Sequence, residues 1–365
     1  MNKNKTSHSF INKGKILFQN FRRLFTKKKC SAFNVSANNK KIECIEKIYV
    51  INLDRQPNRY NRVQSEFSKI MDTSRNRLTN ILERVTAVDA INLEQDAPID
   101  NINSKYTLGE QLFVDPCQAL PKDLNLDMNI NMSKQEIAVA LSHIKVWKKI
   151  ASGTESYALV IEDDICLHPN FSSLMEESWK ELIKKETKGN LFDILFLSFK
   201  EVDLGAEKVA FTESTFKLFR GIWYMSGYVL SKEGASKLIE MLPLRGPVDL
   251  WINHKFDQLT ALMIKKSIIP QRSDEASVNF YSVLPILSQI GVLNDGSPSV
   301  FKNKPTTLPV FAIGKESDKL TSLSMALSML GFTCCSDLFE LQKDEKNSLI
   351  KNLSDRKFNA YINVK

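Results

Sequence analysis

The sequence predicts an α/β sandwich with a mainly parallel sheet flanked by helices. Over roughly 230 residues, short apolar runs alternate with longer segments whose apolar residues recur at helical spacing. One run, Tyr157–Ile161, has five apolar or aromatic residues in succession, which is typical of a strand buried on both faces. No stretch approaches the roughly 18 uncharged apolar residues of a transmembrane helix, so no membrane span is expected.

The first half of this region supplies a strand, a helix and a long connection. Lys47–Leu53 is an apolar strand, and the polar, proline-containing stretch 54–59 ends it. A helix is expected from Pro57 to Met71, because its apolar residues share one face. Residues 92–132 are rich in Asn and Asp, and we expect a mostly irregular excursion that serves as a lid or binding loop.

The next helix begins at a capping box, in which Ser133 caps the backbone and Glu136 reaches back to it. Its apolar stripe runs to Ala151. Within that helix Glu136, His143 and Trp147 fall at i, i+7 and i+11, so they share one side.

Strands and helices continue to alternate after Tyr157–Ile161. Leu191–Phe199 and Trp223–Leu230 are expected strands, and Ser231 begins a helix through Leu242. The pair Gly234-Ala235 allows this helix to pack closely. A short helix is expected to start at Pro247.

Three carboxylates, Glu162, Asp163 and Asp164, stand where the buried strand should emerge. Ligands of open α/β sheets bind at the carboxyl ends of the strands. Clustered acids need a cation or strong donors to stay charged, and oxygen ligands suit Mg²⁺ or Mn²⁺, which in turn suit a diphosphate. The alternative is a solvated acidic turn.

The net charge of +8 is concentrated near the amino terminus, where residues 1–42 contain eleven Lys or Arg and no acid. This segment is expected to be a disordered basic tail, or a short amphipathic helix over residues 15–30 that rests on an anionic membrane surface. Nucleic-acid binding is disfavoured because no recognisable module accompanies the charge. Six cysteines without C-x-x-C spacing indicate reduced thiols and a cytoplasmic protein, with membrane contact at the inner face as a hypothesis.

Three units are therefore expected along the chain: the basic tail 1–42, a catalytic domain 43–293 and an appendage 300–365. The appendage is too short for an independent enzyme domain.

Taken together, these segments resemble glycosyltransferase family 25, the lipooligosaccharide-type and procollagen-type galactosyltransferases. Five blocks stand in the family's order: Ile51–Arg55 with Arg59, Glu136–Trp147, Tyr157–Asp164, Gly227–Ala235 and Pro247–Asp249. One departure is Ala138-Val139, where the family has Gly-Cys.

The resemblance implies a GT-A-like fold and a metal site in which Glu162, Asp163 and Asp164 hold Mn²⁺ or Mg²⁺. It also implies transfer of a hexose, with galactose from UDP-galactose expected first, to a glycan or hydroxyl acceptor with inversion. Such a reaction belongs to lipopolysaccharide, lipooligosaccharide or protein-glycan synthesis. UDP-glucose stays open as an alternative donor.

Within that site, Asp164 is expected to bind the metal directly, while Glu162 or Asp163 holds a metal-bound water or the ribose. Inverting transfer needs a base for the acceptor hydroxyl. Asp249 is the first candidate, because it stands at an expected helix start in a matching block. Glu136 is the second, although its capping box is a complete structural explanation by itself.

Other candidates would bind the donor. Asn52, Asp54, Arg55 and Arg59 are expected to hold the base, ribose or diphosphate, since arginine offers bidentate donors to phosphate. For Arg55 and Arg59 the alternative is ordinary surface charge. His143 positions a phosphate, contacts the acceptor, or completes a buried helix face.

A second resemblance lies in the appendage. Phe311–Gly314, Thr321–Leu323 and Leu327–Gly331 are similar to the opening strand, phosphate loop and helix of sulfotransferases. Acids at Glu316 and Asp318 suit a phosphate-binding loop poorly. We expect a degenerate segment without sulfuryl transfer.

Two other function classes predict different sequence features. A non-catalytic glycan-binding or scaffold protein with this fold predicts a damaged carboxylate cluster, whereas all three acids are present. A metal-dependent phosphohydrolase would gather further His or Asp ligands, and the chain has only four histidines.

Overall fold

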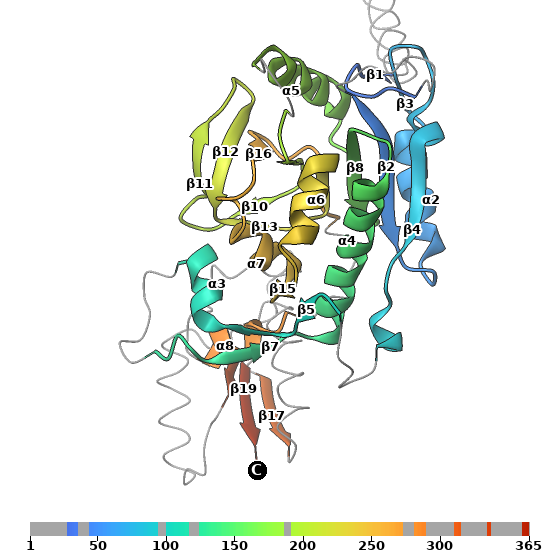
Figure 1. The fold of residues 1–365 in the computed structure, drawn as a ribbon. Coiled ribbons are helices and arrows are strands. Elements are labelled where there is room, and N and C mark those ends of the chain that lie inside the picture. Colours follow the sequence, from blue (N-terminus) through green and yellow to red (C-terminus); the bar gives the residue numbers. More distant parts are fainter. Residues whose placement is uncertain are drawn as a thin grey trace, which may run out of the picture.

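A computed structural model describes residues 28–35, 44–93, 100–116, 124–185, 191–272, 281–289, 310–314, 334–336 and 360–364. Its centre is an eight-stranded sheet with the order β11-β12-β16-β9-β14-β8-β2-β4 (Figure 1). The strands are β2 (Ile45–Asn52), β4 (Leu82–Thr86), β8 (Tyr157–Glu162), β9 (Ile194–Phe196), β11 (Glu207–Ala210), β12 (Thr215–Arg220), β14 (Gly227–Ser231) and β16 (Ala261–Ile264).

The sheet is mixed in direction. Strands β4, β2 and β8 are parallel neighbours, and so are β9 and β16. Strand β14 lies antiparallel between β8 and β9, and β12 is antiparallel to both β11 and β16. Within this sheet β12 and β14 therefore run against all the other strands, and the loop before β14 meets the carboxyl end of β8.

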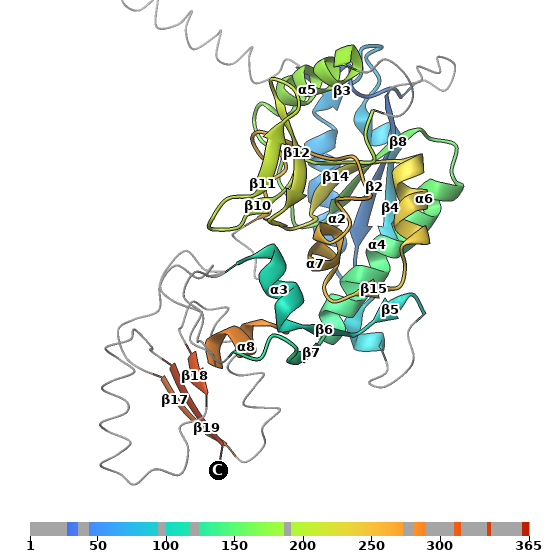
Figure 2. The same cartoon turned by 60° about the vertical axis from the view of Figure 1, so that its left-hand side comes forward.

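Helices cover both faces, as expected for an α/β sandwich. One face packs against α4 (Lys134–Ser152), α6 (Lys232–Glu240) and α7 (Val248–Asn253), and the other against α2 (Pro57–Phe67) and α5 (Phe171–Lys185) (Figures 1 and 2). Side chains of β8 alternate between the two cores: Ala158 and Val160 face α4, while Tyr157, Leu159 and Ile161 face α5.

Helix α2 ends at Phe67, four residues earlier than expected, because Ile70–Met71 form strand β3. Strand β3 pairs in parallel with β1 (Lys28–Lys29). Phe33 packs in the core at 1% exposure, together with Cys30 and Ala32. Part of the segment expected to be a basic tail therefore belongs to the fold, and residues 1–27 lie outside the described residues.

The excursion expected over 92–132 is more regular than its composition indicates. Its described parts contain β5 (Ile102–Asn103), β6 (Lys105–Thr107), α3 (Leu108–Val114) and β7 (Asn129–Asn131). Helix α3 begins at a capping box formed by Thr107 and Glu110. Short elements form here because Tyr106, Leu108 and Val114 are fully buried in the main core.

The remaining elements are short connections and a separate small sheet. The connections are η1 (Leu78–Ile81), η2 (Ala90–Asn92), β10 (Lys200–Glu201), β13 (Ile222–Trp223) and β15 (Leu244–Arg245).

Beyond α8 (Leu284–Gln289), the strands β17 (Val310–Gly314), β19 (Ala360–Val364) and β18 (Cys334–Ser336) form a parallel sheet apart from the large one (Figure 2). The strand expected at Phe311–Gly314 is confirmed. The loop and helix of the sulfotransferase resemblance fall outside the described residues, and that resemblance stays a prediction.

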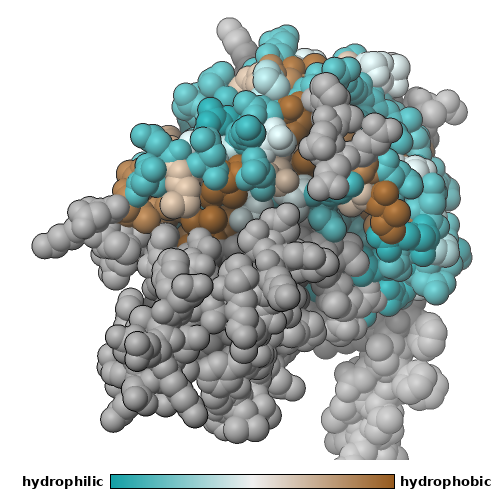
Figure 3. All heavy atoms as spheres, turned by 90° about the horizontal axis from the view of Figure 1, so that it is seen from below, coloured by the Kyte–Doolittle hydropathy of each residue, from teal (hydrophilic) through white to brown (hydrophobic). Residues whose placement is uncertain are grey.

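On the face seen from below, the described residues form a mainly hydrophilic surface with separate hydrophobic patches (Figure 3). Scattered exposed apolar side chains of this kind are normal and identify no partner by themselves. Among the described helices, none combines the length and apolar composition that crossing a bilayer requires.

The start of α4 joins two distant parts of the chain. The Ser133 hydroxyl accepts from the Glu136 amide at 3.1 Å, and Glu136 Oε2 accepts from the Ser133 amide at 2.7 Å, which confirms the capping box. Its other oxygen, Oε1, accepts from the backbone N–H of Ser282 at 2.9 Å. Glu136 therefore both caps α4 and fastens the segment that leads into α8.

Replacing Gly234 by alanine is expected to destabilise the fold. A Cβ at Gly234 would lie 2.3 Å from the backbone oxygen of Asp193, so α6 would have to move away from the chain entering β9. We expect the free energy of unfolding in urea to fall by about 1–3 kcal/mol. The control Ser236→Ala, on the same helix, should change it by less than about 0.5 kcal/mol. Equal stability of both variants would contradict this close approach.

Substitution of Glu136 by glutamine is expected to change how stability depends on pH. Burial raises the pKa of Glu136 from 4.5 to about 7, although hydrogen bonds from Ser282 and Ser133 offset part of the rise. At intermediate pH the folded chain thus binds a proton that the unfolded chain has released, and the free energy of unfolding falls as the pH rises. The stability of wild type relative to Glu136→Gln should fall by roughly 1–3 kcal/mol between about pH 5 and about pH 8. Urea denaturation at both values tests this, and a difference independent of pH would contradict it.

Candidate active site

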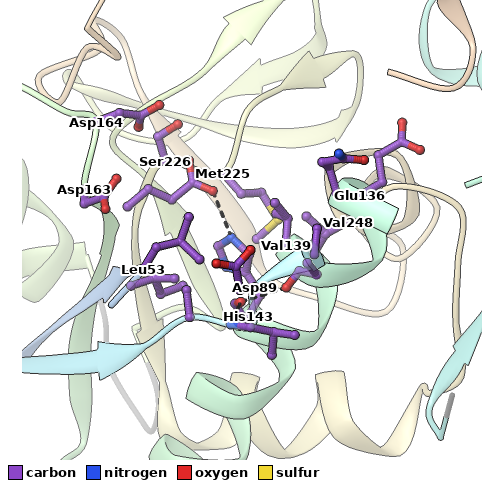
Figure 4. A pocket seen from close by; sticks show the side chains of 18 of the residues that line it. Leu53, Asp89, Glu136, Val139, His143, Asp163, Asp164, Met225, Ser226 and Val248 are labelled. Carbon is purple, nitrogen blue, oxygen red and sulfur yellow. Dashed lines mark hydrogen bonds and ion pairs between the residues drawn. The ribbon is translucent and has the colours of Figure 1, made fainter. Parts of the chain in front are cut away.

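A cavity of about 440 Å³ lies at the carboxyl ends of β2 and β8 (Figure 4). Its walls come from the loop after β2, the turn after β8, η2, and the first turns of α4 and α7. Of the ten predicted site residues, eight line it: Arg55, Arg59, Glu136, His143, Glu162, Asp163, Asp164 and Asp249. Segments far apart in the sequence thus meet at the sheet edge that the sequence indicated.

Glu162 meets His143 because of strand alternation. As the residue after Ile161 in β8, Glu162 shares the α4 side of the sheet with Ala158 and Val160. Its Oε1 lies 3.4 Å from Nε2 of His143, which is 1% exposed. Burial raises the pKa of Glu162, but hydrogen bonds from His143 and Ser226 outweigh that effect and leave it below its ordinary value.

Two buried aromatic residues orient His143. The Trp147 indole N–H donates to the Tyr228 hydroxyl at 2.9 Å, and that hydroxyl lies 3.0 Å from Nδ1 of His143. Because Trp147 only donates, the Tyr228 proton is available to Nδ1, and a proton on Nε2 would then face Glu162. His143 therefore contributes to the site by holding Glu162.

Asp163 turns toward a different set of donors. Its carboxylate accepts from Asn52 Nδ2 at 2.6 Å and from Arg59 Nη1 at 3.3 Å. Burial raises the pKa of Asp163, and Asn52 and Arg59 offset part of that rise. Asn52 is 1% exposed and also accepts from Arg84, so it supports the site from behind and does not line the cavity.

Asp164 has one satisfied and one unsatisfied oxygen. Oδ2 accepts from Gln271 Nε2 at 2.9 Å, whereas Oδ1 is buried and has no hydrogen-bond partner within the described part of the chain. Burial, followed by the nearby charge of Glu162, raises the pKa of Asp164 to about 7. A buried carboxylate oxygen without a donor is a favourable position for a cation.

The three acids point to different partners and do not converge. Among the described residues, no group of three His, Cys, Asp or Glu side chains is arranged to hold a metal ion. An all-protein metal cage is therefore absent from this part of the chain. Mg²⁺ is nevertheless usually bound by one or two carboxylates together with substrate phosphates, which fits the free oxygen of Asp164.

The predicted donor-binding residues fall into two groups. Arg55 and Arg59 line the cavity, and Arg55 Nε pairs with Asp89 at 2.7 Å. Asp54 instead pairs with Arg84 at 2.5 Å, has a side chain 70% exposed, and does not line the cavity. The structure thus places Asp54 outside the cavity, because the chain turns its side chain outward after β2.

The two candidate bases differ in how their oxygens are engaged. Burial raises the pKa of Asp249, whose oxygens accept from the backbone N–H groups of Tyr224 at 3.4 Å and Leu250 at 3.1 Å. Both oxygens of Glu136 are held by shorter bonds from Ser133 and Ser282. Figure 4 shows Glu136 at the end of the cavity away from Asp163 and Asp164. This geometry favours Asp249 as the base and a structural role for Glu136.

Sequence reasoning did not find several residues of the site. Gln271, Ser226, Tyr224 and Tyr281 line the cavity, and Gln271 holds Asp164. Only Tyr224 carries a conformational peculiarity, a positive φ of 76°, which the sequence does not reveal. Ser226 directly precedes the block Gly227–Ala235, and this position is the sequence feature that could have indicated it.

Comparison with known proteins identifies a family. The sequence profile described as glycosyltransferase family 25 (LPS biosynthesis protein) matches residues 45–252. A glycosyltransferase 25 family member of Aedes aegypti is 27% identical over 216 residues, which cover 58% of this chain and 31% of the relative.

Other relatives belong to the same family, and some of them are named as inactive members. A protein of Bos taurus named probable inactive glycosyltransferase 25 family member 3 is 27% identical over 217 residues, covering 58% of this chain and 32% of its own. The chain spans about a third of the length of these relatives. Since the profile covers more than half of the chain, the protein belongs to glycosyltransferase family 25.

Proposed function

We propose that this chain is an active, metal-dependent, inverting hexosyltransferase that uses a nucleotide-diphosphate sugar, with UDP-galactose as the expected donor. The observation that carries the proposal is the buried Oδ1 of Asp164, which has no hydrogen-bond partner among the residues that the structure describes and lies in the same cavity as Arg55 and Arg59. A carboxylate oxygen suited to a cation and two guanidinium groups suited to phosphate are what a diphosphate donor requires.

The acids have separate tasks in this proposal. Asp164 would hold Mn²⁺ or Mg²⁺, and Glu162, oriented by His143, would hold a water of that ion or the ribose. The bound ion would supply Lewis-acid neutralisation of the diphosphate leaving group. Asp163 would keep Arg59 oriented toward the cavity, since both oxygens of its carboxylate already accept hydrogen bonds from Asn52 and Arg59.

Asp249 would take the proton of the acceptor hydroxyl. Its raised pKa makes it a stronger base than an exposed aspartate, and it lines the cavity. Direct attack of that hydroxyl on the anomeric carbon gives inversion.

The acceptor is proposed to be a glycan or another hydroxyl, in lipopolysaccharide or protein-glycan synthesis, and the family description names LPS biosynthesis. A cytoplasmic location, with the basic residues upstream of strand β1 contacting the inner face of the membrane, is part of the same proposal; residues 28–30 of the expected segment 15–30 belong to the fold instead. It would bring the enzyme to lipid-linked acceptors.

A second function, a non-catalytic glycan-binding protein, has one observation in its favour: a relative of Homo sapiens, 26% identical over 215 residues, is named inactive glycosyltransferase 25 family member 3. Against it stand Glu162, Asp163 and Asp164, all present in this chain and all lining the cavity.

Removing the Asp164 carboxylate is expected to abolish metal-dependent binding of UDP. Isothermal titration in the presence of Mn²⁺ should show that wild type binds UDP. The affinity of Asp164→Ala for UDP should be at least about tenfold lower, because the cation loses its protein ligand. The control Asp54→Asn, outside the cavity, should keep UDP affinity within about twofold of wild type.

The donor is identified by incubating wild type with a panel of UDP-sugars and measuring the slow hydrolysis of each. The UDP-sugar that is hydrolysed is the expected donor. Wild type that folds but fails to bind UDP with or without metal would overturn the transferase proposal and favour the glycan-binding alternative.

Replacing the proposed base should slow transfer while sparing donor binding. We expect Asp249→Asn to lower kcat by roughly 10²–10⁴-fold, the usual contribution of a general base, with UDP affinity unchanged. Steady-state kinetics with the identified donor and a glycoside acceptor measures this. If Glu136→Gln lost kcat to that extent and Asp249→Asn did not, the assignment of the base would be wrong.

A further inference from the structure

A short segment outside the family match completes the cavity. Tyr281 lines the cavity, although the family profile ends at residue 252. The segment 281–283 leads directly into α8. Neither the profile nor the matching sequence blocks assigns it a role.

Three contacts fix this segment against the body of the protein. The Ser282 backbone N–H donates to Glu136 Oε1 at 2.9 Å, and the hydroxyls of Ser282 and Tyr106 lie 2.8 Å apart. The next residue, Val283, is 8% exposed within the main core. The backbone that carries Tyr281 is therefore held at the Glu136 end of the cavity.

Tyr281 itself contributes a neutral hydroxyl to an acidic environment. Burial raises its pKa above the ordinary value, and the charges of Asp249, Glu162 and Asp164 add to the rise. The phenol thus stays protonated, and it can donate one hydrogen bond and accept others. The residue is partly exposed and lines the cavity, so a ligand in the cavity can contact it.

The two ends of the cavity differ in chemistry. Arg55 and Arg59 make one part suited to a diphosphate, while Asp249 and Val248 line the part that α7 contributes. An acceptor must reach Asp249 without displacing the donor. A tyrosine, with an aromatic face and a polar tip, suits the apolar face and the hydroxyls of a sugar ring.

We propose that Tyr281 is an acceptor-binding residue, which holds a hydroxyl-bearing sugar beside Asp249 and which the Ser282–Glu136 hydrogen bond positions. This assignment rests on the proposed transferase function. It also gives Glu136 a defined task as a positioning residue.

The test separates use of the donor from use of the acceptor. Tyr281→Phe and Tyr281→Ala are compared with wild type and with Tyr60→Phe, a control on α2 outside the cavity. Two rates are measured with Mn²⁺ and the UDP-sugar selected by the donor panel: hydrolysis, with water as acceptor, and transfer to a mixture of methyl glycosides of glucose, galactose, mannose and N-acetylglucosamine.

We expect hydrolysis and donor KM to stay within about twofold of wild type in every variant. Transfer should fall about threefold in Tyr281→Phe and at least about tenfold in Tyr281→Ala, with a higher acceptor KM. Tyr60→Phe should transfer as wild type does. Thermal melting of each variant verifies folding.

Three outcomes would overturn the acceptor role: a parallel fall of hydrolysis and transfer, unchanged transfer in Tyr281→Ala, or transfer by wild type to none of the glycosides. Failure of the transferase proposal itself is recognised separately, because wild type would then not bind UDP.

Discussion

The carboxylates of Glu162, Asp163 and Asp164 are consecutive in the sequence and lie close together. Burying them together costs free energy unless neighbouring side chains donate hydrogen bonds to them, and this requirement explains the positions of the surrounding residues. Each acid is stabilised by a different element: His143 of α4 for Glu162, Arg59 of α2 for Asp163, and Gln271 after β16 for Asp164. Like charges at this spacing raise one another's pKa unless donors or a cation intervene. The turn therefore brings together residues from both helical layers and from the segment after β16. Of the three acids, as far as the structure describes the chain, Asp164 has a buried oxygen without a hydrogen-bond partner.

Much of this arrangement could be predicted from the sequence, where local patterns are strong. The capping box of Ser133 and Glu136, the buried strand Tyr157–Ile161 and the side shared by His143 and Trp147 depend on spacing alone. Helix α5 carried a readable signal as well, since Phe171, Met175, Trp179 and Leu182 recur at helical spacing, yet it was not predicted.

The rest depends on contacts that no local pattern encodes. The direction of β14 is set by its pairing with β8 and β9, and that pairing brings Tyr228 to His143. Asp54 and Asn52 are two residues apart in the sequence, but one turns to solvent and the other supports Asp163 from within. Tyr281 reaches the site because the next residue, Ser282, contacts Tyr106 and Glu136, which are more than a hundred residues away in the sequence. The local sequence around Tyr281 therefore does not predict its position.

The parallel pairing of β1 with β3 bears on how the basic amino-terminal region can be dissected. Phe33 packs against Phe171, with ring centroids 6.3 Å apart and ring planes tilted by 37°, and it belongs to the core beneath α5. A truncation at residue 42 would remove Phe33 together with the positive charge. A loss of lipid binding could then not be distinguished from the effect of a destabilised core. Only a boundary placed upstream of Lys28 separates the two effects.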